Sequence, residues 1–287
     1  MRARRGVLTA VALLLLGVFT SALFLVDRTY GYAGLAAGPD ESELNGVDAV
    51  RVTVVLKRID TSSSTAIADI LVEPIGTLTD GKGRFLRPAS VELSTYRTDP
   101  IAASAGRMPS VEERRIAVTG TAVDYPFDRY RMSFSVTPLS ADGRPIPATV
   151  IVVDSVGSFA VKPVAQTNDG GALDVDLTAA RTAPSIAFAG FVMLLMFGLA
   201  GAALTAAYYV LAIHRGLLFP ACSMLAGMLF ALPPLRHQLP GDPAPPTGSF
   251  IDFVAFFPAL AIVALSLISA VLGGYAIERR AARTESG

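Results

Sequence analysis

Long apolar runs and short alternating runs divide the chain into two kinds of sequence. Four of the long runs carry almost no charge, and an α-helix needs roughly 20 such residues to cross the hydrocarbon core of a bilayer. The pattern therefore predicts four transmembrane helices, one N-terminal and three C-terminal. Their predicted ranges are 6–26, 184–213, 217–235 and 251–277.

Residues 27–183, between the first two predicted helices, have the pattern of an all-β domain. Short runs rich in Val, Ile and Thr alternate with turn signals such as Asp142–Gly143. In the clearest run, Arg129–Val136, every second residue is apolar: Tyr130, Met132, Phe134 and Val136. About seven or eight such runs without a convincing helix predict a β-sandwich-like domain, with a small barrel as the alternative.

The placement of arginine predicts the membrane topology. Residues 1–5 and the predicted tail 278–287 carry three arginines each, so both are expected in the cytoplasm. The β-domain and a short loop at 236–250 are then extracytoplasmic, and the protein is a multi-pass protein of the cell membrane. The first helix is expected to be an uncleaved signal anchor because its apolar core is long; a cleaved signal peptide is the alternative.

Composition narrows the function. The chain of 287 residues is 52% hydrophobic and 17% charged, as expected for a membrane protein, and its zero net charge gives no sign of nucleic-acid binding. One cysteine, Cys222, excludes a disulfide framework within the chain. The only histidines, His214 and His237, fall on opposite membrane faces in this topology, so no histidine-based catalytic or metal site is expected. We predict no enzymatic activity and no cofactor.

A proline-rich hairpin between the last two predicted helices is the first candidate site. Pro233 and Pro234 are expected to break the third helix, while Ser249 and Asp252 have the spacing of a capping box. Arg236 and Asp252 flank the hairpin and are expected to pair near the membrane surface, where an unpaired charge is costly. The hairpin is either a rigid structural element or a loop that docks on the β-domain.

A turn in the β-domain, Tyr125-Pro126-Phe127-Asp128, is the second candidate site. Proline and aspartate favour a fixed turn, and Phe127 is the expected buried anchor. The turn is either purely structural or a contact loop at the membrane-facing end of the domain. It resembles the Phe-Pro-Phe-Asp turn of pentameric ligand-gated channels, although the flanking cysteines and the run of four helices of that family are missing.

The hairpin also carries a recurring signature, which resembles the uncharacterised membrane proteins of domain-of-unknown-function family 4436. The pattern departs from the family at His237, where Asn is common, and by extra residues between Gly241 and Pro245. The resemblance implies the one-plus-three helix layout over most of the chain and implies no activity. The residues that carry it are Pro234, Arg236, Pro240, Gly241, Pro245, Pro246, Gly248 and Asp252.

Two functions are compatible with this architecture. The first is a non-enzymatic envelope or assembly protein whose outer domain binds a protein, a lipid or a glycan. The second is an oligomeric channel-like or transport protein. Transport paths usually carry ionisable residues within the membrane, and the predicted spans have such residues only at their ends, which favours the first function. The oligomeric state is left open.

Overall fold

The computed structural model describes residues 35–40, 42–169, 171–212, 218–241 and 244–285. The chain forms two compact units. The β-unit comprises the described residues up to Ala122 and Phe127–Pro184, and the helical unit comprises Val123–Pro126 and the residues from Ser185 onward. The predicted signal-anchor helix at residues 6–26 lies outside the described residues.

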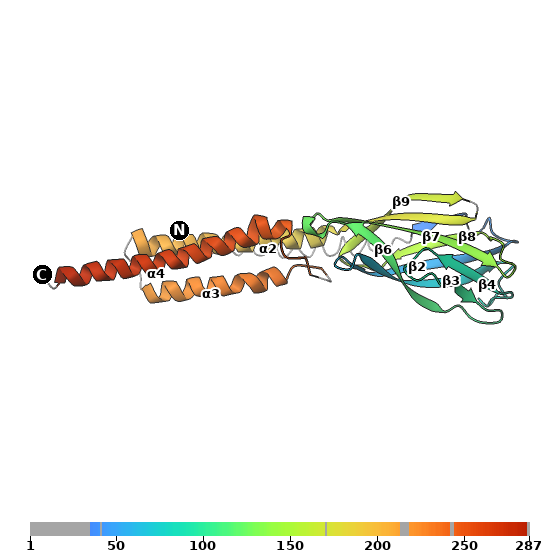
Figure 1. Ribbon diagram of the computed structural model, residues 1–287, viewed down its shortest axis with the longest axis horizontal. Coiled ribbons are helices and arrows are strands. Elements are labelled where there is room, and N and C mark those ends of the chain that lie inside the picture. Colours follow the sequence, from blue (N-terminus) through green and yellow to red (C-terminus); the bar gives the residue numbers. More distant parts are fainter. Residues whose placement is uncertain (1–34, 41, 170, 213–217, 242–243, 286–287) are drawn as a thin grey trace, which may run out of the picture. The chain divides into compact units, whose positions relative to one another are not determined.

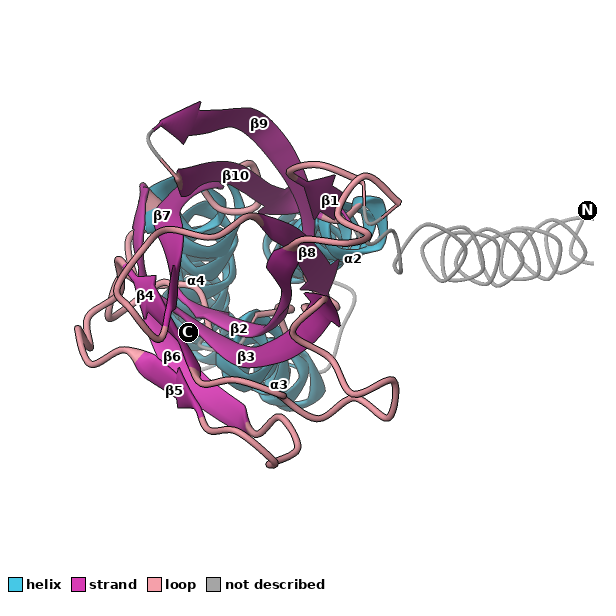
Figure 2. Ribbon diagram, turned by 90° about the vertical axis from the view of Figure 1, so that its right-hand side faces the viewer, coloured by secondary structure: helices cyan, strands magenta, loops and turns pink. Residues whose placement is uncertain are grey.

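The β-unit is built from ten described strands that share one curled sheet (Figures 1 and 2). Their bounds are Leu35–Ala37 (β1), Asp48–Asp60 (β2), Thr65–Gly76 (β3), Ala89–Leu93 (β4), Ile101–Ala103 (β5), Val111–Gly120 (β6), Arg129–Ser140 (β7), Ala148–Asp154 (β8), Phe159–Asp169 (β9) and Ala172–Arg181 (β10). Neighbouring strands follow the order β1-β8-β2-β3-β6-β7-β10-β9, and β4 pairs with both β5 and β7. The predicted all-β domain is therefore confirmed.

Strand β6 makes the sheet curl. Its first part pairs with β3, from Val111 to Ala117, and its last residues Val118–Gly120 pair with β7. Beyond this point β4 takes the place of β6 along β7, pairing with Val136–Ser140. Figure 2 shows the strands arranged around a common interior. The curled sheet thus encloses its core between facing strands, as a sandwich does.

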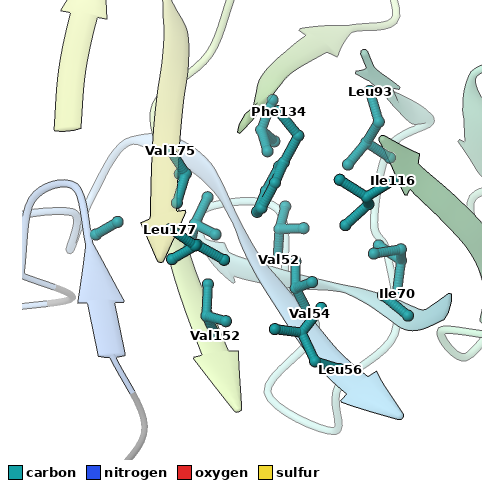
Figure 3. Packing of buried hydrophobic residues seen from close by; sticks show 14 of the residues in the cluster. Val52, Val54, Leu56, Ile70, Leu93, Ile116, Phe134, Val152, Val175 and Leu177 are labelled. Carbon is teal, nitrogen blue, oxygen red and sulfur yellow. The ribbon is translucent and has the colours of Figure 1, made fainter. Parts of the chain in front are cut away.

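Alternation along the strands supplies the core. In β7 the predicted apolar face is buried: Tyr130, Met132, Phe134 and Val136 are each at most 2% exposed. Figure 3 shows Phe134 among apolar side chains from other strands, including Val52 of β2 and Val175 of β10. Since successive side chains of a strand point to opposite faces, one face of each long strand fills the interior and the other carries the polar residues.

Three helices form the rest of the helical unit: α2 (Ala183–Ala212), α3 (Leu218–His237) and α4 (Phe257–Glu285), and a π-helical turn at Asp252–Phe256 leads directly into α4. All three are long and apolar enough to cross a membrane, and they run alongside one another in Figure 1. The predicted three C-terminal membrane helices are therefore confirmed as apolar helices of sufficient length.

The helices pack through narrow seams. Along the π-helical turn and α4 the buried positions recur every three or four residues and are mostly small: Ala255, Ala259, Val263, Ser266 and Ala270. Such a repeat keeps one side of a helix against its neighbours, and small side chains let helices approach closely in lipid. Close approach is direct at Gly273, where an added Cβ would lie 2.1 Å from Cδ2 of Leu211 on α2.

The expectation that Pro233 and Pro234 end the third helix is wrong. Helix α3 continues through both prolines to His237. Each proline removes one backbone donor but has a φ compatible with a helix, and the following turn is held by the bond that the Gln238 N–H donates to the carbonyl of Pro234 (3.2 Å). The side chain of Arg236 in this last turn is also fixed by Asp252, which stabilises the helix end.

Candidate functional site

A buried ion pair joins the start of β7 to the end of β10. The Nε of Arg181 donates to both carboxylate oxygens of Asp128 at 3.1 Å, and its Nη2 donates to Oδ2 at 3.0 Å. The side chains of Arg181 and Asp128 are only 3% and 1% exposed. A bidentate arginine–carboxylate pair of this kind is geometrically specific, so it fixes the two strand ends with respect to each other.

Aromatic rings enclose this pair. Arg181 lies opposite Phe159 in the β9–β10 register, and its guanidinium carbon is 4.1 Å from the centre of the Phe159 ring. Phe159 in turn packs edge-on against Tyr130, with ring centres 5.5 Å apart. Burial, followed by the nearby Asp128 carboxylate, raises the pKa of Tyr130 above its ordinary value. The phenol therefore stays neutral, and the ring cluster shields the ion pair from water.

The position of the ion pair in the chain is more informative than its chemistry. Asp128 comes one residue after Phe127, where the chain returns to the β-unit, and Arg181 comes three residues before Pro184, where the chain leaves it. The pair therefore joins, inside the β-unit, the residues just after the chain enters this unit before β7 and those just before the chain leaves it after β10.

The turn at Tyr125–Asp128 is divided between the two units. Tyr125 is 1% exposed and belongs to the apolar cluster of the helical unit, with Ala189 of α2 and Ala255 among its members. Pro126 is also buried, whereas Phe127 is 60% exposed. The prediction that Phe127 is the buried anchor is thus wrong, because the chain turns at Pro126 and the anchor is Tyr125.

The hairpin between α3 and α4 has a second buried ion pair at its base. Arg236 donates from Nε to Oδ1 of Asp252 and from Nη2 to Oδ2, each at 3.0 Å, which is the predicted pairing. The same Nη2 lies 3.0 Å from the carbonyl of Pro245 and 2.9 Å from that of Pro246. One guanidinium group therefore connects the end of α3, the loop and the start of the next helix.

Asp252 also organises the helix start. Its Oδ2 accepts the backbone N–H of Gly248 at 2.8 Å and that of Ser249 at 3.3 Å. The Ser249 bond is one half of the predicted capping box; in the other half, the N–H of Asp252 donates to the Ser249 carbonyl and not to its hydroxyl. Gly248 has φ +84°, a left-handed conformation that favours glycine.

The remaining hairpin candidates contribute through the backbone or through packing. Pro245 is buried, Pro240 and Gly241 are half-buried, and Pro234 and Pro246 are exposed. The structure therefore brings Arg236, Pro245, Pro246, Gly248 and Asp252 together and leaves Pro234 on the outer surface of α3. Docking of this loop on the β-domain stays a prediction.

A polar hollow lies on the outer face of the curled sheet. Its volume is about 270 Å³, and Asp174 and Asp176 of β10 line it opposite Ser135 and Ser133 of β7. Ser94 completes the hollow, and its hydroxyl accepts the backbone N–H of Ser135 at 2.7 Å. Within the described residues, no three His, Cys, Asp or Glu side chains are close enough together to hold a metal ion. The hollow instead offers carboxylates and hydroxyls as hydrogen-bonding groups.

The family of the β-unit follows from its sequence. Residues 40–179 match the model of a family described as a domain of unknown function, DUF4436. The chain carries a DUF4436 domain. Residues 181–276 match a second family described as a domain of unknown function, DUF8686. The expected resemblance is confirmed over the DUF4436 domain, while the hairpin residues on which it was based fall within the second match. No curated protein matches the chain.

Arg181 was not among the predicted site residues, although the sequence contains a signal for it. It is the last charged residue before an uncharged stretch that extends beyond the end of α2. A charge at the edge of an apolar helix needs a partner, and the DUF4436 domain supplies Asp128 from a strand 53 residues earlier in the chain. The identity of that partner depends on the pairing of β7 with β10, which the sequence pattern does not specify.

Replacing Asp128 by Ala should destabilise the DUF4436 domain strongly, because it leaves the Arg181 guanidinium buried without its carboxylate. Loss of one partner of a buried pair costs about 3–5 kcal/mol. Denaturant titration of the full-length protein in detergent, followed by circular dichroism of the β-structure, measures the change.

Asp99→Ala is the matched control, since Asp99 pairs with Arg97 on the surface, where both side chains are more than 60% exposed. An exposed pair contributes about 0–1 kcal/mol. Equal shifts of the unfolding midpoint for the two variants would contradict the structural role assigned to Asp128.

Proposed function

We propose that the protein is a non-enzymatic, multi-pass protein of the cell membrane that holds its DUF4436 domain outside the membrane to bind a component of the envelope. The N- and C-termini are cytoplasmic in this proposal, and the first helix is a signal anchor. The partner is a protein, a lipid or a glycan of the envelope.

One observation carries the proposal: the chain changes unit three times, before Val123, after Pro126 and after Pro184. A domain that only needs to be tethered requires a single connection, and a flexible linker would serve. Here a segment of the β-domain's own sequence is part of the helical core through Tyr125. This favours a domain that is presented by its membrane helices over one that is merely attached to them.

The charges around the helices support the proposed sidedness. Three arginines follow the apolar part of α4: Arg279, Arg280 and Arg283. The hairpin has a single Lys or Arg, Arg236 at the C-terminal end of α3, and Asp252 neutralises its charge. Cytoplasmic loops and tails are enriched in Lys and Arg. The α4 tail is therefore proposed to be cytoplasmic, and the hairpin extracytoplasmic.

The surface of the DUF4436 domain supports binding more than catalysis. The hollow lined by Asp174, Asp176 and three serines presents acceptors and donors to a polar partner. The sequence has no nucleophile motif, phosphate-binding loop or pair of histidines on one membrane face that would indicate a reaction.

Thiol labelling tests the proposed sidedness. In a Cys222→Ala background, single cysteines are introduced at Lys82, in an exposed turn of the DUF4436 domain, and at Arg283, exposed in the last turns of α4. Spheroplasts are treated with a membrane-impermeant maleimide. We expect labelling of the Lys82→Cys protein in intact spheroplasts, and labelling of the Arg283→Cys protein only after permeabilisation. The opposite pattern would overturn the topology.

A channel-like oligomer is the second candidate, because the burial of Tyr125 in the helical unit is compatible with it as well. The turn that resembles the coupling turn of ligand-gated channels does contribute a side chain to the helices. Against it, no charged residue occurs in α2 or between Asp252 and Glu278, and conduction paths commonly carry such residues.

The number of subunits distinguishes these two candidates. Light scattering of the purified protein, with the detergent mass subtracted, should give a monomer or a dimer, which has too few helices to enclose a pore. A closed ring of several subunits would contradict the first proposal and favour the channel-like one, for which current across a reconstituted bilayer is the next measurement.

A further inference from the structure

Most of the surface of the three helices is apolar and is not covered by any other residue that the structure describes. Only 28%, 17% and 28% of the most apolar segments of α2, α3 and α4 are buried. The exposed side chains are large: Phe253 in the π-helical turn is 67% exposed, and Leu265 and Leu272 of α4 are 63% and 67% exposed. Exposure of such a surface to water would be very unfavourable. Its two ends along the helices therefore show which part of the helices needs an apolar environment.

One end of this surface is marked by buried polar groups. At the end of α3 and in the π-helical turn before α4, these groups are Arg236 and Asp252, together with the loop carbonyls that Arg236 binds. On α2 the group is Ser185, which is 8% exposed in the first turn of the helix. Phe253 lies next to this level and packs edge-on against Phe257, with ring centres 5.5 Å apart.

The other end is marked by tyrosines. Tyr208 and Tyr209 near the end of α2 are 61% and 52% exposed, and Tyr275 of α4 is 61% exposed. The guanidinium carbon of Arg279 is 5.8 Å from the ring centre of Tyr275. Exposed tyrosines with an apolar ring and a polar hydroxyl are typical of the membrane–water interface, where an adjacent arginine can reach the headgroups.

The two levels have the same separation on both helices. Tyr208 follows Ser185 by 23 residues, and Tyr275 follows Asp252 by 23 residues. At 1.5 Å per residue either span is about 34 Å long. Leu211 lies against Gly273, so the tyrosine level of α4 is displaced from that of α2 by five residues, or roughly 7 Å along the helix axes. A hydrocarbon core is about 30 Å thick, and helices tilt by about 20°, so the separation fits one bilayer.

We propose that the occupant of this exposed surface is lipid, and that the hydrocarbon core is bounded at one side by the Arg236–Asp252 pair and Ser185 and at the other by Tyr208, Tyr209 and Tyr275. This rests on the proposed membrane function and adds the depth of each residue. The base of the proline-rich hairpin then lies at the membrane surface, and Leu265 lies deep in the acyl chains.

The sequence contains no tryptophan, so single tryptophans report depth without background. Phe253→Trp replaces an exposed residue of the π-helical turn, and Leu265→Trp and Tyr275→Trp replace two exposed residues of α4. Each full-length protein is reconstituted into phosphatidylcholine vesicles brominated at a shallow or at a deep acyl position. We expect deep bromines to quench Leu265→Trp more strongly, by about twofold, and shallow bromines to quench the other two more strongly.

Three other results would overturn the proposal in different ways. Similar depth for all three tryptophans, with quenching by lipid, would show that the boundaries are misplaced. Absence of quenching at Leu265→Trp in protein that floats with the vesicles would show that a second copy, the segment 6–26 or another protein covers this face. Failure of the protein to float with the vesicles or to resist carbonate extraction would contradict the membrane proposal itself.

Discussion

The contact between Arg181 and Asp128 is the interaction on which the organisation of the β-domain depends. It joins the beginning of β7 to the end of β10. Both residues lie within a few positions of a point where the chain passes from one unit to the other. Because both charges are buried, neither can be removed without exposing the other to an apolar environment. The stacked ring of Phe159 strengthens the same contact. A specific, enclosed pair thus fixes the two strand ends where the fold changes from sheet to helix.

The helical unit uses the same device at its hairpin. Arg236 and Asp252 are again a bidentate, buried pair, and here the arginine also satisfies two loop carbonyls. Without these bonds the carbonyls after α3 would have to find water at the edge of an apolar region. Both pairs therefore occur where regular structure ends and backbone groups need partners. Each pair fixes the positions of the backbone segments that it joins.

The sequence predicts what depends on local pattern. Alternation identifies the buried face of β7, and uninterrupted apolar length identifies the three C-terminal helices. The pairing of Arg236 with Asp252 also follows, because the two residues flank one short hairpin. The partner of Arg181 and the burial of Tyr125 in place of Phe127 do not follow, since both depend on contacts between distant segments. The continuation of α3 through Pro233 and Pro234 does not follow either, because the local pattern marks the prolines as a helix end while the backbone of the last turn closes from Gln238 to Pro234.

The central claim is that Tyr125, although its sequence neighbours belong to the β-domain, stabilises the helical unit. Hydrogen–deuterium exchange of the full-length protein tests it directly, comparing Tyr125→Ala with the exposed-site control Phe127→Ala. The account predicts faster exchange in the first turns of α2 and around Leu239, which belongs to the same apolar cluster, for Tyr125→Ala and little change for Phe127→Ala. Exchange that changes only in β6 and β7, or equally in both variants, would contradict it.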